Sequence, residues 1–184
     1  TSPLNPIVQK NTKDIFEADN STPDCTLQSL KGWKCLKTTV TTMEGNTYNI
    51  LLKWNRPNIQ SRGTIFWGLG GNGMGESRED PPSKAVMDQL DQLDSMRTVA
   101  YEMMDPTTGN DFGGGYWKHY GGYKSASQIF MAILELSVSR NLFQGNFLNY
   151  MGGSNGSTIP AYAMAKHNAD IYFDRVVFQM GPFL

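Results

Sequence analysis

The sequence has little charge, few histidines and cysteines, and no long apolar run. Charged residues make up 18% of its 184 positions and the formal net charge is −1. This near balance disfavours nucleic acid as an obligate partner, because such a partner calls for a strongly basic surface. No apolar stretch approaches the roughly 20 residues that a membrane-spanning helix needs. We therefore expect no nucleic-acid partner and no transmembrane segment, and the length suits one domain with a buried core.

Only two cysteines are present, Cys25 and Cys35. An even number close together in the sequence is typical of a small disulfide loop in an oxidising compartment, and two unpaired buried thiols in a cytosolic protein are the alternative. The sequence begins with Thr1 and has no apolar leader, which we interpret as a mature N-terminus left after removal of a signal or pro-segment. These features favour a secreted, extracellular or periplasmic protein, in which Asn20 would lie in a glycosylation sequon.

The pattern of apolar residues divides the chain into an N-terminal arm, 1–37, and a main domain, 38–184. Turn residues and β-rich runs predict a hairpin over 35–57. Beyond it, the sequence alternates between expected strands at 62–71, 97–106, 146–152 and 174–182 and expected helices at 84–96, 125–142 and 157–167. This alternation predicts the α/β class, with a mostly parallel sheet and helices on both faces.

Two of the expected helices have apolar positions at helical spacing. In the helix over 84–96 these are Val86, Leu90 and Leu93, and Ser83 is a candidate N-cap. The helix over 125–142 is nearly all apolar. Its inward positions are expected to be Ile129, Ile133, Leu134 and Leu136.

Ser154 lies in Gly152-Gly153-Ser154-Asn155-Gly156, which fits the pattern G-x-S-x-G. The pattern is short and the chain holds 19 glycines, so the match alone is weak evidence. However, an expected strand runs into the motif and an expected helix runs out of it, as around the strained turn that presents a nucleophilic serine. Ser154 is therefore either a nucleophile, with the N–H of Asn155 as an oxyanion donor, or a small residue in a glycine-rich turn.

A second glycine-rich segment, 68–75, ends the strand expected over 62–71, and its glycines free the backbone to present N–H groups. With the hairpin, this loop, the strand–helix pairs and the serine motif, the chain resembles the α/β-hydrolase family over roughly 38–182. The resemblance implies that Ser154 is the nucleophile and that Leu69 or Gly70 supplies a second oxyanion N–H. Leu69-Gly70-Gly71 stands where the family often has His-Gly-Gly. Acyl transfer by a serine needs no metal and no organic cofactor, and we expect neither.

The same glycines, Gly68 to Gly73, also fit the dinucleotide fingerprint G-x-G-x-x-G. That motif opens a helix at once, so that the pyrophosphate meets the helix N-terminus. Here residues 74–83 come between the motif and the next expected helix. The acidic residue that binds the ribose usually follows the glycines by about 20 residues, and Glu102 and Asp105 come later than that. A nucleotide site is therefore disfavoured.

A nucleophilic serine needs a histidine base and an acid, which follow the serine in the order acid, histidine in this family. His167 is on the helix that leaves the motif, and Asp170 and Asp174 precede the last expected strand, at the opposite edge of the sheet. His119 lies in a long glycine- and aromatic-rich loop, where a surface or packing role is the alternative to catalysis. The family continues with further strands, so we expect a C-terminal companion chain, made by cleavage or encoded separately, to carry the acid and the histidine.

By this resemblance the first expectation is a serine hydrolase that acts on a small ester or acyl substrate. Side chains near the expected site line an apolar substrate pocket in this interpretation, or pack within loops in the alternative. The pocket candidates are Trp67, Trp117, His119 and Tyr120.

A different class of function is a non-catalytic hydrolase-fold protein used for binding or assembly, and a third is a carbohydrate-binding surface over 113–122.

Overall fold

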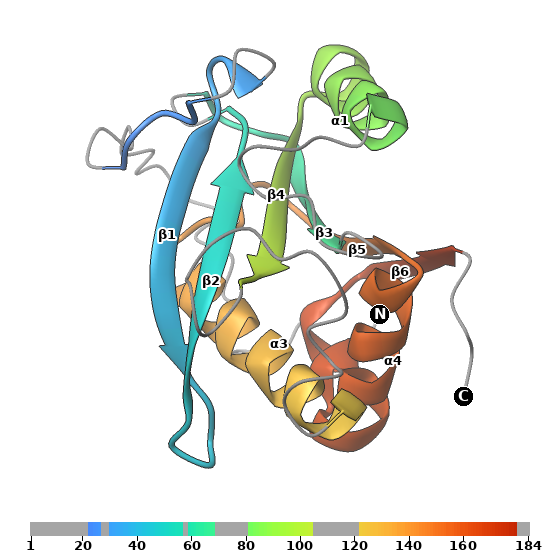
Figure 1. Ribbon diagram of the computed structural model, residues 1–184. Coiled ribbons are helices and arrows are strands. Elements are labelled where there is room, and N and C mark those ends of the chain that lie inside the picture. Colours follow the sequence, from blue (N-terminus) through green and yellow to red (C-terminus); the bar gives the residue numbers. More distant parts are fainter. Residues whose placement is uncertain (1–21, 27–29, 57–58, 69–80, 105–121, 180–184) are drawn as a thin grey trace.

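The structure of the protein is a computed structural model that describes residues 22–26, 30–56, 59–68, 81–104 and 122–179 (Figure 1). Its elements are β1 (Lys34–Thr41), β2 (Thr47–Trp54), β3 (Gly63–Gly68), α1 (Pro81–Asp94), β4 (Met96–Met103), α3 (Gly122–Ser139), β5 (Leu148–Gly153), α4 (Asn155–His167), the 3-10 helix η3 (Ala169–Tyr172) and β6 (Arg175–Gln179). The described strands form one sheet in the order β1-β2-β4-β3-β5-β6. The strands β3, β4, β5 and β6 are parallel to one another, whereas β2 is antiparallel to both of its neighbours, β1 and β4. This topology confirms the α/β class expected from the sequence.

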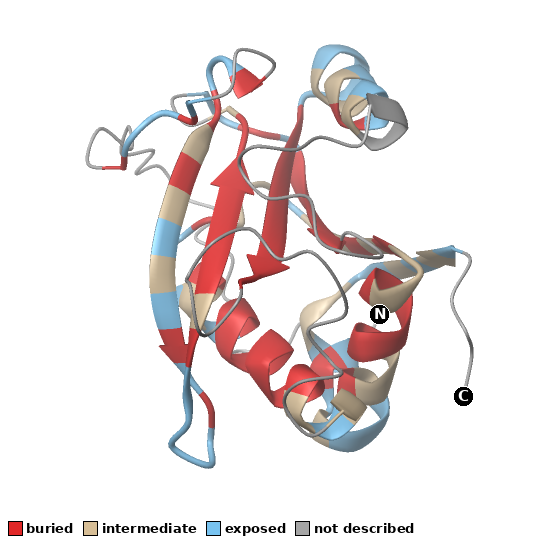
Figure 2. Cartoon of the chain, in the orientation of Figure 1, coloured by how far each residue is buried: buried red, intermediate tan, exposed pale blue. Residues whose placement is uncertain are grey.

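Helices cover both faces of the sheet. Alternate residues of a strand point to opposite faces, so Ile50 and Leu52 of β2 pack with α3 and α4, whereas Leu51 packs on the face of α1. Figure 2 shows the central strands β2, β4 and β3 buried along most of their length and the edge strand β1 only at intervals. The sheet therefore has a core on each side. The α3–α4 side includes Phe66, Phe130, Ile133 and Tyr150, and the α1 side includes Trp33, Ile65, Trp67 and Met87.

Two details of the helices differ from the sequence-based expectations. α1 begins at Pro81, so Ser83 is not its N-cap, and proline is well suited to a first helical turn because the N–H it lacks has no helical acceptor there. Val86 and Leu93 are exposed, and among residues 84–94 of α1 the one buried against the sheet is Met87. The inward face is thus displaced by one position, with Leu90 still packed at its border. In α3 three of the expected inward residues are buried and Leu136 is partly buried.

The disulfide expected between Cys25 and Cys35 is present. Cys35 belongs to β1, and the backbone N–H of Cys25 donates to the carbonyl of Trp33 at 2.9 Å. Trp33 and Leu30 are buried in the core on the α1 face. The disulfide therefore ties the residues around Cys25 to the edge strand β1, next to the buried Leu30 and Trp33.

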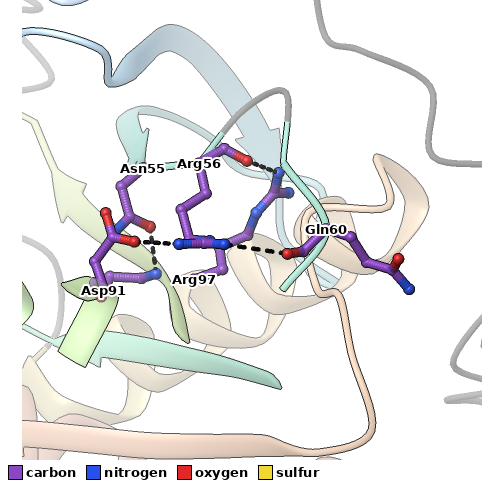
Figure 3. Close-up of polar contacts among 6 residues, drawn as sticks. Asn55, Arg56, Gln60, Asp91 and Arg97 are labelled. Carbon is purple, nitrogen blue, oxygen red and sulfur yellow. Dashed lines mark hydrogen bonds and ion pairs between the residues drawn. The ribbon is translucent and has the colours of Figure 1, made fainter. Parts of the chain in front are cut away.

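A polar cluster lies at the edge of the sheet where β4 begins (Figure 3). The buried Arg97 donates to the carbonyl oxygens of Leu142 at 3.1 Å and Arg56 at 2.7 Å. The side chain of Arg56 in turn forms an ion pair with Asp91 of α1, and Asn55 accepts a backbone N–H of β4 at 2.6 Å. These contacts join the end of β2, the start of β4 and α1.

The connections at the two ends of β3 and β4 differ in length. At the amino ends of the parallel strands, Ser95 alone joins α1 to β4, with a φ of 53° and its N–H donating to the Asp91 carbonyl at 3.1 Å. From the carboxyl ends of β3 and β4 the chain continues through the longer segments 69–80 and 104–121 before the next described helix. Within the described residues no helix has the length and apolar character to cross a bilayer.

We expect replacement of both cysteines by serine to lower the free energy of unfolding. The disulfide closes a loop with a sequence separation of 10, for which the loss of loop-closure entropy in the unfolded chain corresponds to about 2–3 kcal/mol. Urea unfolding of the oxidised protein and of the Cys25→Ser/Cys35→Ser variant measures this difference. Equal stability of the two proteins would contradict a structural role for the disulfide.

Candidate active site

Ser154 alone connects the end of β5 with the start of α4. Its backbone has φ 52° and ψ −120°, a region that residues with a side chain rarely adopt. Such a conformation costs about 1–3 kcal/mol and persists only where the surrounding structure enforces it.

Hydrogen bonds hold the backbone of Ser154 on both sides. Its N–H donates to the carbonyl of Gln179, at the end of β6, at 2.9 Å, and its carbonyl accepts from the N–H of Ser157 at 2.9 Å and of Thr158 at 3.1 Å. The hydroxyl, by contrast, makes no capping bond to the helix, although serine commonly caps a helix from this position. The side chain is half-buried, and among the described residues the structure gives the Ser154 hydroxyl no hydrogen bond.

The hydroxyl of Ser157 braces the turn from within. It lies 2.6 Å from the carbonyl oxygen of Gly152 and 3.0 Å from that of Gln179, and it accepts the N–H of Gln179 at 3.1 Å. Ser157 is fully buried. One side chain of the first helical turn thus contacts the ends of both β5 and β6, on either side of the strained residue.

The two glycines before Ser154 are not equivalent. A methyl group on Gly152 would lie 2.0 Å from the carbonyl oxygen of Gly156, closer than any real contact, whereas for one on Gly153 the nearest atom among the described residues, the carbonyl oxygen of Gln179, would be 3.8 Å away. The clash would be with backbone, which cannot move aside as the end of a side chain can. Gly152 must therefore be a glycine for α4 to approach β5 this closely, whereas Gly153 need not be.

The start of α4 offers hydrogen-bond donors beside Ser154. The N–H groups of Asn155 and Gly156 lie in the first turn, where an α-helix provides no intrahelical acceptor, and the helix dipole is positive at this end. Asn155 is the predicted oxyanion donor, and its N–H occupies this first turn. The second predicted donors, Leu69 and Gly70, lie outside the described residues, directly after Gly68, which is the register partner of Gly152.

His167 lies at the last turn of α4, at the opposite end of that helix from Ser154. Its Nε2 is 3.0 Å from the hydroxyl of Ser127 in α3, and that hydroxyl also donates to the carbonyl of Lys124 at 2.7 Å. Because a hydroxyl has one proton, the imidazole donates in this pair and does not act as a base toward Ser127. This serine–histidine contact joins α3 to α4 and is not a nucleophile–base pair.

The remaining candidates lie elsewhere. Asp174 accepts the N–H of Leu148 at 2.7 Å, at the start of β5, and Asp170 lies in η3. Trp67 packs in the core on the α1 face and is buried there. Its assignment to a substrate pocket stays a prediction. Among the described residues no group of three or more potential ligand side chains could hold a metal ion. Outside the described residues lie Trp117, His119, Tyr120, Asn20 and most of the segment 113–122.

Sequence reasoning missed a pair of buried tyrosines beneath the turn. The hydroxyl of Tyr150, in β5, donates to the carbonyl oxygen of Gly156, and the hydroxyl of Tyr101, in β4, lies 3.0 Å from that of Tyr150. Burial raises the pKa of both phenols, so both remain protonated donors at neutral pH. The signal in the sequence was the position of Tyr150 two residues before Gly152, which places both on one face of β5.

No protein-family model and no curated protein sequence matches the chain. Solved structures do. Oligopeptidase B from Trypanosoma brucei superposes with a TM-score of 0.53 at 16% identity over 81% of this chain and 20% of that one. A post-proline cleaving enzyme from Rickettsia typhi gives 0.54 at 17% over 83% and 21%. A cold-adapted esterase from an Arctic intertidal metagenomic library gives 0.53 at 13% over 80% and 60%.

The chain has the α/β-hydrolase fold. It spans about a fifth of the length of oligopeptidase B and of the post-proline cleaving enzyme, and 60% of that of the esterase. In an α/β-hydrolase sheet, the strand–turn–helix unit with the pattern G-x-S-x-G is the place of a nucleophilic serine, and Ser154 occupies such a unit between β5 and α4. The fold expected from the resemblance is thus confirmed.

We expect Gly152→Ala and Gly153→Ala to differ sharply. The first change places a methyl group against the Gly156 backbone and is expected to lower the free energy of unfolding by about 3 kcal/mol, as overpacking in a core does. The second is expected to stay within about 0.5 kcal/mol of the wild type. Urea unfolding of the two variants measures the contrast, and similar losses in both would contradict the role assigned to Gly152.

The buried tyrosines predict a loss of stability in alkali. Above about pH 10 an unfolded tyrosine loses its proton, whereas Tyr101 and Tyr150 keep theirs because burial raises the pKa of both. The unfolded state then binds fewer protons, so the free energy of unfolding falls as the pH rises, by up to about 1.4 kcal/mol per pH unit for each tyrosine. Urea unfolding at pH 9 and 11 should show a shallower fall in the Tyr101→Phe/Tyr150→Phe variant, and an unchanged fall would refute the assignment.

Proposed function

We propose that this chain carries the nucleophile and part of the oxyanion hole of a serine hydrolase that acts on carboxylic esters or related small acyl compounds. The observation that carries the proposal is the backbone of Ser154, at φ 52° and ψ −120° between β5 and α4, with a hydroxyl that does not cap the helix. A turn serine with a merely local role gains nothing from that conformation. Strain of this kind clusters at active sites, where it fixes the direction of a reacting group.

In the proposed reaction the Ser154 oxygen attacks the acyl carbon of the ester. The serine proton passes to a histidine and from there to the leaving alcohol as the bond to that alcohol breaks. The N–H of Asn155, in the first turn of α4, stabilises the negative charge on the acyl oxygen, together with an N–H from Leu69 or Gly70. Water then opens the acyl-enzyme and restores the serine. No metal or organic cofactor is needed for these steps.

The histidine and the acid are proposed to come from a C-terminal companion chain. Two observations support this source. His167, at the far end of α4, donates to Ser127 and is not placed to serve Ser154. Along β6, no described strand pairs with the edge opposite β5, and Val177 there is 46% exposed. The disulfide between Cys25 and Cys35 supports the further proposal that the protein is secreted, in an oxidising extracellular or periplasmic compartment.

The alternative is a non-catalytic hydrolase-fold protein for binding or assembly, in which the turn is retained as architecture. What favours it is the engagement of His167 with Ser127, which leaves no histidine beside Ser154 among the described residues. The similar structures include both peptidases and an esterase. The activity assay therefore compares ester substrates with peptide substrates.

The test is the labelling of Ser154 by a fluorophosphonate, followed by intact-mass and peptide-mass analysis of the native protein under non-reducing conditions. We expect the probe on the peptide that contains Ser154, a co-purifying second polypeptide, and hydrolysis of p-nitrophenyl acetate. Ser154→Ala should abolish labelling and lower kcat by roughly 10³-fold or more. The matched control is Gly153→Ala, whose added methyl group meets only ordinary contacts, and which should label like the wild type.

Each result bears on one part of the proposal. A folded protein that the probe never labels would refute catalysis and favour the binding alternative. Labelling of Ser154 in a lone chain of 20.5 kDa would support the nucleophile and refute the companion, and His119→Ala would then show whether that histidine is the base. Faster cleavage of peptide amides than of esters would overturn the ester preference.

A further inference from the structure

The helix that starts at the Ser154 turn contains a proline in its second turn. In an α-helix each carbonyl accepts the N–H of the residue four positions later. The partner of the Gly156 carbonyl would be residue 160, which is proline and has no N–H. Gly156 is buried, and an unpaired carbonyl in such a place costs about as much as a lost hydrogen bond. The first turn of α4 therefore needs a donor from outside the helix.

That donor is the hydroxyl of Tyr150. It reaches the Gly156 carbonyl oxygen from β5, and the Tyr101 hydroxyl lies 3.0 Å behind it. Because the single proton of Tyr150 goes to Gly156, the proton between the two tyrosines must belong to Tyr101. The donors thus run in one direction, from Tyr101 in β4 through Tyr150 in β5 to the first turn of α4, and all three groups are buried.

This contact lies where the helix, β3 and β5 come closest. A methyl group on Gly68 would lie 1.9 Å from the Tyr150 oxygen and 3.0 Å from the Gly156 carbonyl oxygen, and one on Gly152 would lie 2.0 Å from that same carbonyl. Gly156 is two residues after Ser154 and one after Asn155. The position of its carbonyl therefore sets how the first helical turn, with the Asn155 N–H, lies against the sheet.

We propose that Tyr150, supported by Tyr101, is a positioning residue for the Ser154 turn, because its hydroxyl replaces at the Gly156 carbonyl the helical donor that Pro160 removes. It acts through Gly156 on the nucleophile and on the oxyanion donor and touches neither substrate nor reacting atoms. Its catalytic consequence rests on the proposed function, whereas the hydrogen-bond replacement itself does not. Ser157 braces the β6 side of the same turn, so the tyrosines secure the side toward β3 and β4.

The experiment is a double-mutant cycle of Tyr150→Phe and Pro160→Ala in the full chain. Tyr150→Phe leaves the Gly156 carbonyl buried and unpaired, and should raise the equilibrium constant for unfolding by roughly 10- to 100-fold. Pro160→Ala restores an N–H at the position that normally pairs with that carbonyl. In the Pro160→Ala background the same tyrosine change should therefore cost at least about fivefold less.

The catalytic readout is the rate of fluorophosphonate labelling and the kcat and KM for p-nitrophenyl acetate, measured where every variant is more than about 99% folded. Tyr150→Phe should lower the labelling rate and kcat about tenfold or more with little change in KM, since small misplacements of reacting groups are costly. Pro160→Ala should restore most of that loss. A purely structural role would leave the rates of the folded protein unchanged.

Two further variants keep the test decisive. Tyr101→Phe retains the bond from Tyr150 to Gly156 and should give a smaller loss in the same direction, which serves if Tyr150→Phe does not fold. Tyr162→Phe is the matched control, because this tyrosine is on the same helix and the structure gives its hydroxyl no hydrogen bond among the described residues. Tyr162→Phe should match the wild type in both readouts.

The two proposals fail separately. If wild-type Ser154 is not labelled, the proposed function fails and the positioning role with it, while the unfolding cycle still measures whether Tyr150 replaces the donor lost at Pro160. If the wild type is labelled but Tyr150→Phe matches it, or Pro160→Ala gives no rescue, the inference is overturned and the proposed function stands.

Discussion

The left-handed backbone of Ser154 is the constraint on which the rest of the site depends. For a residue with a side chain that conformation costs free energy and persists only where its neighbours enforce it, and here each neighbour contributes. β6 accepts the Ser154 N–H through Gln179, Gly152 lacks the Cβ that would push α4 away, and Ser157 bonds to the ends of both strands. The helix can start within one residue of the strand only because all these conditions hold together.

The same closeness explains the composition of the layer beneath the turn. Strands β3 and β5 carry glycines at matching register positions, Gly68 and Gly152, and the space this leaves is filled by the hydroxyl of Tyr150 and the carbonyl of Gly156. A polar contact in a buried, largely aromatic layer is stable only when each of its groups is paired. The tyrosine pair meets that condition, and it does so where Pro160 has removed the ordinary helical partner.

The sequence predicted the order of strands and helices and the turn at Ser154, because both depend on local patterns: apolar periodicity and glycines around one serine. It did not predict that Met87, rather than Val86 or Leu93, faces the sheet in α1, since the orientation of this helix depends on contacts with distant residues such as the ion pair of Asp91 with Arg56. Nor did it indicate Tyr150, Tyr101 or Ser157. Their roles depend on which hydroxyl meets which partner in the folded chain. The contacts of Tyr101 with Tyr150 and of Ser157 with Gln179 join residues distant in the sequence, and the contacts within the Ser154 turn belong to no apolar or glycine pattern.

The unequal connections at the two ends of β3 and β4 bear on how such a protein can diversify. Where β4 begins, a single residue, Ser95, makes the turn, and Arg97 and Asp91 tie the adjoining elements together, so an insertion there would disrupt the packing. The long connections instead follow β3 and β4 at the edge that holds Ser154. Segments that connect helices and strands generally tolerate changes in length and sequence far better than the elements they join. New specificities can therefore arise by exchange of these two segments around an unchanged serine turn, at little cost to folding.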